Sequence, residues 1–400
     1  MKDLLPLVPA KKMSVIVLLT LAVGGFAIGT SEFSAMALIP YYSLDLGISQ
    51  ATASHIISAY ALGVVIGAPT FAIVGSHFSR RKMLVALMFI YGIAHIGTIT
   101  STSYHGLLMS RFVSGLPHGA YFGTGALLAA SIVPAHKRSS AVSLMMTGLM
   151  LATVLGVPFA NVLGQIAGWR WGFGLAGTLA LITSVLLYFF APKQDFQQGS
   201  GSTLRELSAL KNPQVIITLL TGAIGFGGFF AVYSYISSTL MQITEDGEGY
   251  VSLVLGIVGF GMFVGTLVVG HFADKDANKS TVVILLSSVI LMLIYPCLAS
   301  SLSTLVPVSF LIGCTASLSI PLQARMVEVS GNGQMLASAL NQSAFATAQA
   351  IGPALVGFAV SQGGSYLLSG YIGAFLSLMG CGLFLVAIKT NRQFQCSNIQ

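Results

Sequence analysis

Apolar residues fill long stretches of this chain, and short polar segments separate them at fairly regular intervals. A helix needs about 20 mostly apolar residues to cross the hydrocarbon core of a bilayer. Stretches of that kind predict twelve membrane-spanning helices near residues 14–39, 51–75, 83–102, 106–131, 141–165, 171–190, 214–239, 250–272, 281–300, 303–326, 335–362 and 366–388. The expected fold class is an all-α polytopic membrane protein. The first stretch is too long for a signal-peptide core and lacks a following A-x-A-like cleavage site, so we expect a retained helix.

The longest polar interruption, residues 191–213, divides the spans into six plus six. We therefore expect an N-terminal six-helix bundle over 1–190, a cytoplasmic linker over 191–213 and a C-terminal six-helix bundle over 214–400. Within the linker, Thr203 and Glu206 have the spacing of a capping box, which suggests a short amphipathic helix on the membrane surface. An unstructured tether is the alternative.

The two halves carry similar features at nearly constant spacing. Gly67 matches Gly261 at an offset of 194 residues, and Gly156 lies opposite Gly352 at an offset of 196. Gly67 and Gly261 each belong to a G-x-x-x-G pair, a pattern that lets helix backbones approach closely. These matches favour duplication of a six-helix unit. Pro158, beside Gly156, lacks a backbone N–H and could serve either as a hinge or in static packing.

Composition and charge exclude a water-soluble fold and indicate an orientation. Hydrophobic residues make up 55% of the chain and charged residues 7%, whereas about a quarter of a soluble domain is charged. The cations lie in alternate gaps between spans, among them Arg80, Arg81 and Arg325, while the other gaps hold Arg170 as their only cation, beside Asp45 and the acidic segment 245–248. The positive-inside rule then places both termini and the linker in the cytoplasm. The net charge of +7 is dispersed, so no nucleic-acid partner is expected.

Only two charged residues lie well inside predicted spans, namely Glu32 in the first and Arg111 in the fourth. Both fall on the periplasmic side of the midplane, within about one helical turn of each other in depth, where they could pair directly or through water. Such a carboxylate could take up and release a proton as water access changes. A permanent structural ion pair is the alternative. His118, near the middle of span four, could hydrogen-bond substrate or carry a proton, unless a neighbouring helix satisfies it; His95 has a weaker claim.

Aromatic and amide side chains replace charges in the spans of the second half. Such a surface suits a neutral or amphipathic organic solute, although core packing also explains many buried aromatics. The predicted substrate-binding residues are Phe33, Met36, Tyr121, Phe226, Phe230, Tyr233, Gln323, Asn341 and Gln342. Further groups of the same kind are Phe229, Tyr235 and Gln349.

Several segments together resemble the major facilitator superfamily, in particular its drug:proton antiporter branch and the bacterial arabinose efflux permease group. The segments are Gly29–Phe33, Tyr60–Pro69, Arg111–Gly119, Leu155–Pro158, Gly168–Trp171 and Pro321–Gln323. The resemblance implies alternating access, with Arg111 in a coupling motif and Gly156 and Pro158 in an antiporter motif. It also marks Gly75, Arg80, Arg81 and Asp274 as conformational residues. Ser79 stands where the superfamily usually has Asp, so the cytoplasmic charge lock is expected to be weaker here.

These observations predict a secondary transporter of the bacterial cytoplasmic membrane that expels a small organic solute, such as a sugar or drug, in exchange for protons. A proton symporter or facilitator for uptake and a non-transporting membrane sensor remain alternatives. An enzyme is not expected, because no converging catalytic set is present, and the phosphate-loop motif of ATP-driven pumps is missing from the sequence. No cofactor or metal is expected, and the expected partners are the solute, protons and the bilayer around a monomer.

Overall fold

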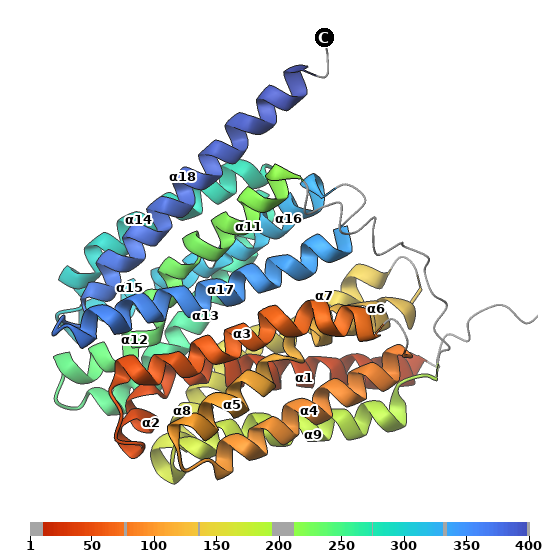
Figure 1. Cartoon of the computed structure of the whole chain (residues 1–400), viewed down its shortest axis with the longest axis horizontal. Helices are drawn as coiled ribbons and strands as arrows, with labels where there is room; N and C mark the ends of the chain where they lie inside the picture. Colours follow the sequence, from red (N-terminus) through yellow and green to blue (C-terminus); the bar gives the residue numbers. More distant parts are fainter. Residues whose placement is uncertain are drawn as a thin grey trace, which may run out of the picture.

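The computed structural model describes residues 11–75, 78–134, 137–193, 212–273, 275–330 and 334–397, and these ranges contain helices and no strands (Figure 1). The helices of the first half are α1 (Lys11–Ala37), α2 (Ile39–Asp45), α3 (Gln50–Gly75), α4 (Arg80–Thr100), α5 (Tyr104–Gly115), α6 (His118–Ser131), α7 (Arg138–Leu151), α8 (Val157–Ala167) and α9 (Trp169–Phe190). Those of the second half are α11 (Pro213–Gly225), α12 (Gly227–Ile243), α13 (Gly247–Ala273), α14 (Ala277–Leu298), α15 (Leu302–Thr315), α16 (Ser319–Val329), α17 (Gln334–Ser361) and α18 (Leu368–Ser397).

Eleven helical runs in the described part of the chain are long and apolar enough to cross a membrane. The expected fourth span is the exception, because it is divided into α5 and α6 at Leu116 and Pro117. Proline has no backbone N–H and clashes with the preceding turn, so a continuous helix is disfavoured there. With this span counted as one broken helix, the prediction of an all-helical, polytopic membrane protein is confirmed.

The breaks follow a pattern that relates the two halves. The first span ends at Ala37 and the short helix α2 follows it after Leu38. The fourth is interrupted at Leu116 and Pro117, the seventh at Phe226, and the tenth by a 3₁₀ turn at Ala316–Leu318. These are the first and fourth spans of each half. Interrupted helices expose backbone and change the direction of side chains, and transporters often use them to build binding sites.

A second irregularity lies in the fifth span, where a π-helical turn at Ala152–Gly156 joins α7 to α8. The Val157 N–H bonds to the carbonyl of Ala152, five residues back. A π turn accommodates one extra residue in a helix and commonly occurs at functional positions. The bend expected near Gly156 and Pro158 therefore takes the form of a π turn immediately before the proline.

Glycine contacts revise the register of the repeat. A Cβ on Gly63 or Gly67 would lie 2.2 Å from the carbonyl oxygen of Phe112 or 2.0 Å from that of Leu116. In the second half, Gly261 and Gly265 approach the carbonyls of Phe310 and Cys314 in the same way, at 2.1 and 2.5 Å. Gly63 thus corresponds to Gly261, an offset of 198 residues. The offset of 194 inferred from the sequence was wrong at this position by one helical turn, because G-x-x-x-G pairs repeat at four-residue intervals.

The helices of the first half pack together, as do those of the second, and the two groups meet along α3 and α17 (Figure 1). A second contact joins α13 to the π turn and α8. The expected linker helix at Thr203–Glu206 and the conformational residue Asp274 lie outside the described residues.

Candidate functional site

Glu32 lies at the boundary between the two halves. It is on α1, and only 8% of its surface is exposed. The Nε2 group of Gln349, on α17 of the second half, donates a hydrogen bond to Glu32 Oε1. Its other oxygen, Oε2, is 3.9 Å from Nδ1 of His118 on α6. Glu32 is also the only buried acid in the described ranges. Its hydrogen bond to Gln349 therefore makes this carboxyl group a direct link between helices of opposite halves.

Arg111 does not form the direct ion pair with Glu32 that its depth allowed. Its guanidinium donates a 2.7 Å hydrogen bond to the Ser31 hydroxyl. It also lies over the rings of Tyr60, at 4.4 Å, and Phe173, at 5.0 Å. Between described residues, Arg170 pairs with Asp45, and His118 lies within ion-pair distance of Glu32 and pairs with it only when its ring is protonated. Helix depth predicts the height of a side chain in the membrane but not its direction around the helix axis, so depth alone left the direct pair as one possibility.

A hydrogen-bonded chain continues from Arg111 into the first half. The Ser31 Oγ is 2.6 Å from His95 Nε2, and His95 Nδ1 is 2.9 Å from the carbonyl oxygen of Tyr91. If Nδ1 donates to that carbonyl, Nε2 must accept from Ser31, whose oxygen is then free to accept from Arg111. This arrangement satisfies His95 within its own half and leaves it without direct contact to Glu32.

His118 contacts Tyr60 as well as Glu32. The Tyr60 hydroxyl is 2.8 Å from His118 Nδ1, and His118 is 6% exposed. The neighbouring helix α3 therefore does supply a hydrogen-bond partner, as one alternative for His118 anticipated. Tyr60, which the sequence did not single out as a site residue, contacts both parts of the site, because its ring lies against Arg111 and its hydroxyl reaches His118.

An aromatic cluster lies beside Glu32 and includes residues of both halves. We define it as Phe33, Phe226, Phe229, Phe230, Tyr233 and Phe345. Phe33 of α1 lies 6.3 Å from the Phe230 ring and 5.7 Å from the Tyr233 ring, so it connects the first half to α12. The Phe226 ring lies 5.0 Å from Phe230 and 5.1 Å from Phe345 of α17. Three of the predicted aromatic residues of the second half are thus brought together around Phe33.

Amide and hydroxyl groups on α17 lie near this cluster. Asn341 donates a 2.5 Å hydrogen bond to Gln323 of α16. Among the described residues, Asn341 Oδ1, Ser343 Oγ and Gln349 Oε1 are buried side-chain atoms with no hydrogen-bond partner. Buried polar atoms are normally satisfied, so these groups are candidates for binding solute or water. Gln342 is half-buried.

Of the two remaining predicted substrate residues, Tyr121 lies away from the aromatic cluster and Met36 lies in the same core. The Tyr121 hydroxyl donates a 2.8 Å hydrogen bond to the carbonyl of Leu21, and the side chain packs among α1 and α6 residues in the core of the first half. Met36 is fully buried in the same core as the aromatic cluster. The structure therefore does not bring Tyr121 together with the aromatic cluster.

The conformational residues lie at helix ends and at the π turn. Gly75 ends α3, Arg80 donates a 3.1 Å hydrogen bond to the carbonyl of Leu127, and Arg81 bonds to the carbonyl of Tyr188. A Cβ on Gly156 would lie 2.1 Å from Thr30 Oγ1, so this glycine permits α1 to approach the π turn.

Three hydrogen bonds join the halves at the ends that the sequence places in the periplasm. Gln165 Nε2 lies 2.9 Å from the Glu248 carbonyl oxygen, and Asn161 Nδ2 lies 2.9 Å from Ser252 Oγ. Ser238 Oγ donates to the side-chain oxygen of Gln50 at 2.6 Å. Together these bonds hold α3, α8, α12 and α13 against one another.

Arg325 differs from its expected position. It was counted as a loop cation, yet it lies in α16, is 1% exposed and bonds to Gln214 at 2.9 Å and to Asn278. The tenth span was predicted to end at residue 326, whereas the helix continues to Val329 and encloses the arginine. The sequence signal available was its place at the end of an apolar stretch, which does not separate a loop cation from a buried one.

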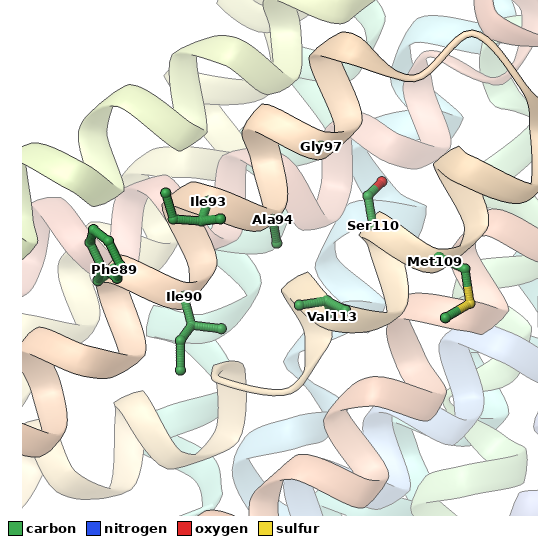
Figure 2. Close-up of a pocket in the computed structure, with 8 residues that line it drawn as sticks. All are labelled: Phe89, Ile90, Ile93, Ala94, Gly97, Met109, Ser110 and Val113. Carbon is green, nitrogen blue, oxygen red and sulfur yellow. The ribbon is translucent and has the colours of Figure 1, made fainter.

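A groove of about 320 Å³ between α4 and α5 lies apart from these residues (Figure 2). Its lining residues are Phe89, Ile90, Ile93, Ala94, Gly97, Met109, Ser110 and Val113. Ser110 supplies the only hydroxyl, which already bonds to Thr98 and to the carbonyl of Leu107. Phe89 and Met109 are more than half exposed, so this apolar surface suits lipid rather than a polar solute.

Comparisons with known proteins agree with these features. The family model described as Major Facilitator Superfamily matches residues 21–331 and 241–395. The "Inner membrane transport protein YdhP" of Escherichia coli (strain K12) is 37% identical, over 94% of this chain and 96% of that protein. The "Probable sugar efflux transporter" of Helicobacter acinonychis (strain Sheeba) is 27% identical, over 95% of this chain and 97% of the relative.

A solved structure supports the fold. The crystal structure of a bacterial homolog to the human lysosomal transporter Spinster, in an inward-facing and unoccupied conformation, matches with a TM-score of 0.73. The match covers 95% of this chain and 98% of that protein at 14% sequence identity. At this identity the similarity concerns the fold alone.

Proposed function

The chain belongs to the major facilitator superfamily, and from this premise we propose that it is a proton-coupled antiporter that expels a small organic solute by alternating access. The family and the relatives are membrane transporters and not enzymes, so the prediction that this protein is not an enzyme is confirmed. The proposal concerns the coupling, the direction and the solute. We further propose that the six helical spans on each side of residues 191–213 move as two bundles.

The position of Glu32 is the observation that carries this proposal. Its hydrogen bond to Gln349 connects the halves, so separating them at this level removes a partner from a buried carboxyl group. A charge left unpaired inside the membrane costs at least about 2–3 kcal/mol. Protonation removes that charge, and binding of a proton can therefore favour the separated arrangement. A carboxyl group at the boundary of two moving bundles is suited to exchange its proton with whichever side of the membrane is open.

The aromatic cluster and the unpartnered atoms of α17 support a solute with both apolar and hydroxyl groups. Aromatic faces bind apolar surface, while Asn341, Ser343 and Gln349 offer hydrogen bonds. The guanidinium of Arg111 is occupied by Ser31 and two rings. A neutral solute such as a sugar fits this chemistry better than an anion, and the name of the Helicobacter relative is in keeping with it.

The bonds that close one end of the molecule support a cytoplasm-facing arrangement. The positive-inside pattern assigns the Gln165–Glu248 end to the periplasm and both termini to the cytoplasm. We propose that this protein lies in the bacterial cytoplasmic membrane as a monomer, with its periplasmic side closed.

Purified protein in liposomes that contain a pH-sensitive dye tests the function. A panel of sugars and aromatic drugs is added, and solute flux and proton flux are measured together. We expect a solute of the panel to drive protons in the opposite direction. Glu32→Gln should reduce pH-gradient-driven flux at least tenfold while leaving solute exchange without a gradient within about tenfold, because an amide keeps the shape but does not cycle a proton.

Glu245→Gln is the matched control, because Glu245 is an exposed acid beyond the end of α12. It should transport as the unaltered protein does. Protons and solute moving in the same direction would indicate symport, solute flux without proton flux would indicate a facilitator, and no flux of either would favour a sensor. Gradient-driven flux that survives Glu32→Gln would move the coupling group elsewhere, with His118 next.

A further inference from the structure

The Gln349 side chain uses only one of its two polar ends within the protein. Its Nε2 donates to Glu32 Oε1, whereas Oε1 has no hydrogen-bond partner among the described residues. The side chain is 3% exposed, so bulk water does not explain the free oxygen. Buried polar atoms normally have a protein, water or ligand partner, so this oxygen is available to accept a hydrogen bond from Glu32 or from a solute.

The free end lies in the region of the aromatic cluster. Helix α17 approaches the start of α12 so closely that a Cβ on Gly352 would lie 2.4 Å from the Gly227 carbonyl oxygen. A Cβ on Gly227 would in turn lie 3.6 Å from the carbonyl oxygen of Ala348, the neighbour of Gln349. Gln349 lies one helical turn after Phe345 of the aromatic cluster. Its partner Glu32 precedes Phe33, whose ring lies against Phe230 and Tyr233. Gln349 is therefore close to the rings at which we place the solute.

We propose that the Gln349 amide inverts when Glu32 is protonated, and that it thereby presents a different hydrogen-bonding group to the solute in each protonation state. This inference rests on the proposed function and extends it by naming Gln349 as the residue that couples protonation of Glu32 to solute binding. A charged carboxylate has only acceptors, so it must face the amide NH₂ group. A neutral carboxyl group donates its O–H, and the amide oxygen of Gln349 is the unused acceptor on the residue that already contacts it.

Five other ionisable groups of the described residues lie around Glu32, and none of them takes the place of Gln349 as its hydrogen-bond partner. They are Tyr60 on α3, Tyr91 on α4, Arg111 on α5, His118 on α6 and Tyr233 on α12. His118 is the nearest to a carboxyl oxygen, at 3.9 Å, which is longer than a hydrogen bond. Gln349 is therefore the direct hydrogen-bond partner of this carboxyl group in the described structure.

The inversion determines which solutes bind in each state. While Glu32 is charged, the site presents the amide oxygen and binds solute groups that only donate hydrogen bonds, such as an amide N–H or an ammonium group. A sugar hydroxyl both donates and accepts, so the inversion discriminates less against it. After protonation the same position presents NH₂, and a donor of the solute meets a donor of the protein. Solute binding and protonation of Glu32 then exclude each other. This mutual exclusion is the condition for antiport rather than symport.

Infrared difference spectroscopy on the whole protein in lipid tests this without a solute. Glutamine is labelled with ¹³C at the side-chain carbonyl, and spectra are recorded as the pH is lowered through the titration of Glu32. A carbonyl that begins to accept a hydrogen bond shifts to lower frequency. We expect one glutamine band to make this shift together with the appearance of the Glu32 carboxylic-acid band.

Three variants assign the signal. Gln349→Met should remove the shifting amide band and move the acid band of Glu32, which loses its acceptor. Gln242→Met, at an exposed glutamine near the end of α12, should leave both bands as in the unaltered protein. Glu32→Gln should abolish the acid band and the amide shift without any change at position 349. If Gln349→Met does not fold, the unaltered protein and Glu32→Gln still give the comparison.

The outcomes separate this inference from the proposed function. A Glu32 acid band that appears while no glutamine carbonyl shifts overturns the inversion and leaves proton coupling by Glu32 intact. An amide shift that persists in Glu32→Gln overturns it as well. Absence of any Glu32 titration in a protein whose gradient-driven flux survives Glu32→Gln overturns the proposed function itself.

Discussion

Arg111 illustrates how a buried charge can be stabilised without an opposite charge. Its partners are the Ser31 hydroxyl and the rings of Tyr60 and Phe173. A hydrogen bond to a charged group contributes about 1.5–3 kcal/mol, and a desolvated cation over an aromatic ring adds about 2 kcal/mol. The residue is thus held by its own half, and it affects Glu32 at a distance rather than by contact.

Double-mutant cycles on unfolding in detergent or lipid should show this arrangement. We expect Ser31→Ala and Arg111→Met to be coupled by about 1 kcal/mol or more, because their side chains touch. Glu32→Gln and Arg111→Met should be coupled less strongly, because these groups do not touch. A larger coupling for the Glu32 pair than for the Ser31 pair would contradict the geometry.

The residues of the site differ in how well the sequence predicted them. Glu32 was predictable, because a lone acid inside an apolar stretch stands out regardless of the fold. Tyr60 and Ser31 were not, since tyrosine and serine are common within spans and only the packing of α1 and α3 reveals their partners. The sequence identified Gln349 as a hydrogen-bonding group of the second half, but its bond to Glu32 depends on the packing of α17 against α1. The sequence left open whether Glu32 and Arg111 pair directly or through water, because periodicity gives depth along a helix, while partners depend on rotation about its axis.

At the scale of single elements, the π turn depends on Gly156. An alanine there would place its Cβ 2.1 Å from Thr30 Oγ1 and 3.0 Å from the Phe26 ring, both on α1. Overpacking of this kind typically costs about 1–3 kcal/mol. Gly156→Ala should therefore lower unfolding stability by that amount and slow transport.

Thr30→Ala should restore part of this loss in the double variant. The Thr30 hydroxyl has no hydrogen-bond partner in the described structure, so its removal relieves the clash at little cost. Thermal unfolding of the two single variants and the double variant provides the measurement. Equal stability of Gly156→Ala and the unaltered protein would show that α1 adjusts without strain.

Helix α2 is fastened to α9 by a titratable contact. Arg170 lies 2.7 Å from the Asp45 carboxylate, and its hydrogen bond lowers the pKa of Asp45 below the ordinary value of 3.8, with a further contribution from Trp169. Because the folded-state pKa is the lower one, the stabilisation is present above pH 3.8 and is lost as the pH falls through the folded-state value.

The pH dependence of melting should reveal this contact. The difference in melting temperature between the unaltered protein and Asp45→Asn should be constant at neutral pH and decrease below about pH 4. Asp246→Asn, at an exposed acid, is the control. A difference that grows on acidification would mean that Asp45 is not held by a cation.

For the molecule as a whole, the alternation of cations predicts opposite sides of the membrane for the linker and the acidic loop. Cysteines placed singly at Ser200 and Asp246 in a cysteine-free background should react differently with an impermeant thiol reagent in intact cells. We expect position 246 to be labelled and position 200 to be protected until the cells are opened. Equal labelling of the two positions in intact cells would contradict the proposed orientation, in which only position 246 faces the outside.

The fold class was largely predictable from the sequence, because a bilayer demands long apolar helices and little else satisfies the backbone inside it. The breaks were less so. The fourth span was predicted as continuous although Pro117 was an available signal for its break, and the interruptions at Phe226 and Ala316–Leu318 involve no proline and depend on how the helices pack. The alignment of the two halves was also wrong by one helical turn at Gly261. Glycines spaced every four residues permit alignments that differ by a turn, and only the packing decides between them.

The π turn also has a consequence for how this chain tolerates insertions and deletions. Before it, Gly148 of α7 lets α1 of the same half approach, and at the turn itself Thr153 meets Gly259 of α13 in the other half. One additional residue rotates the later part of the span by about 100° relative to an uninterrupted helix. Deleting a residue within 152–156 would therefore restore a regular helix of the same apolar character. That helix could direct its packing residues toward α1 or toward α13, but not toward both. The number of residues in this segment thus determines the direction in which every later side chain of the span points.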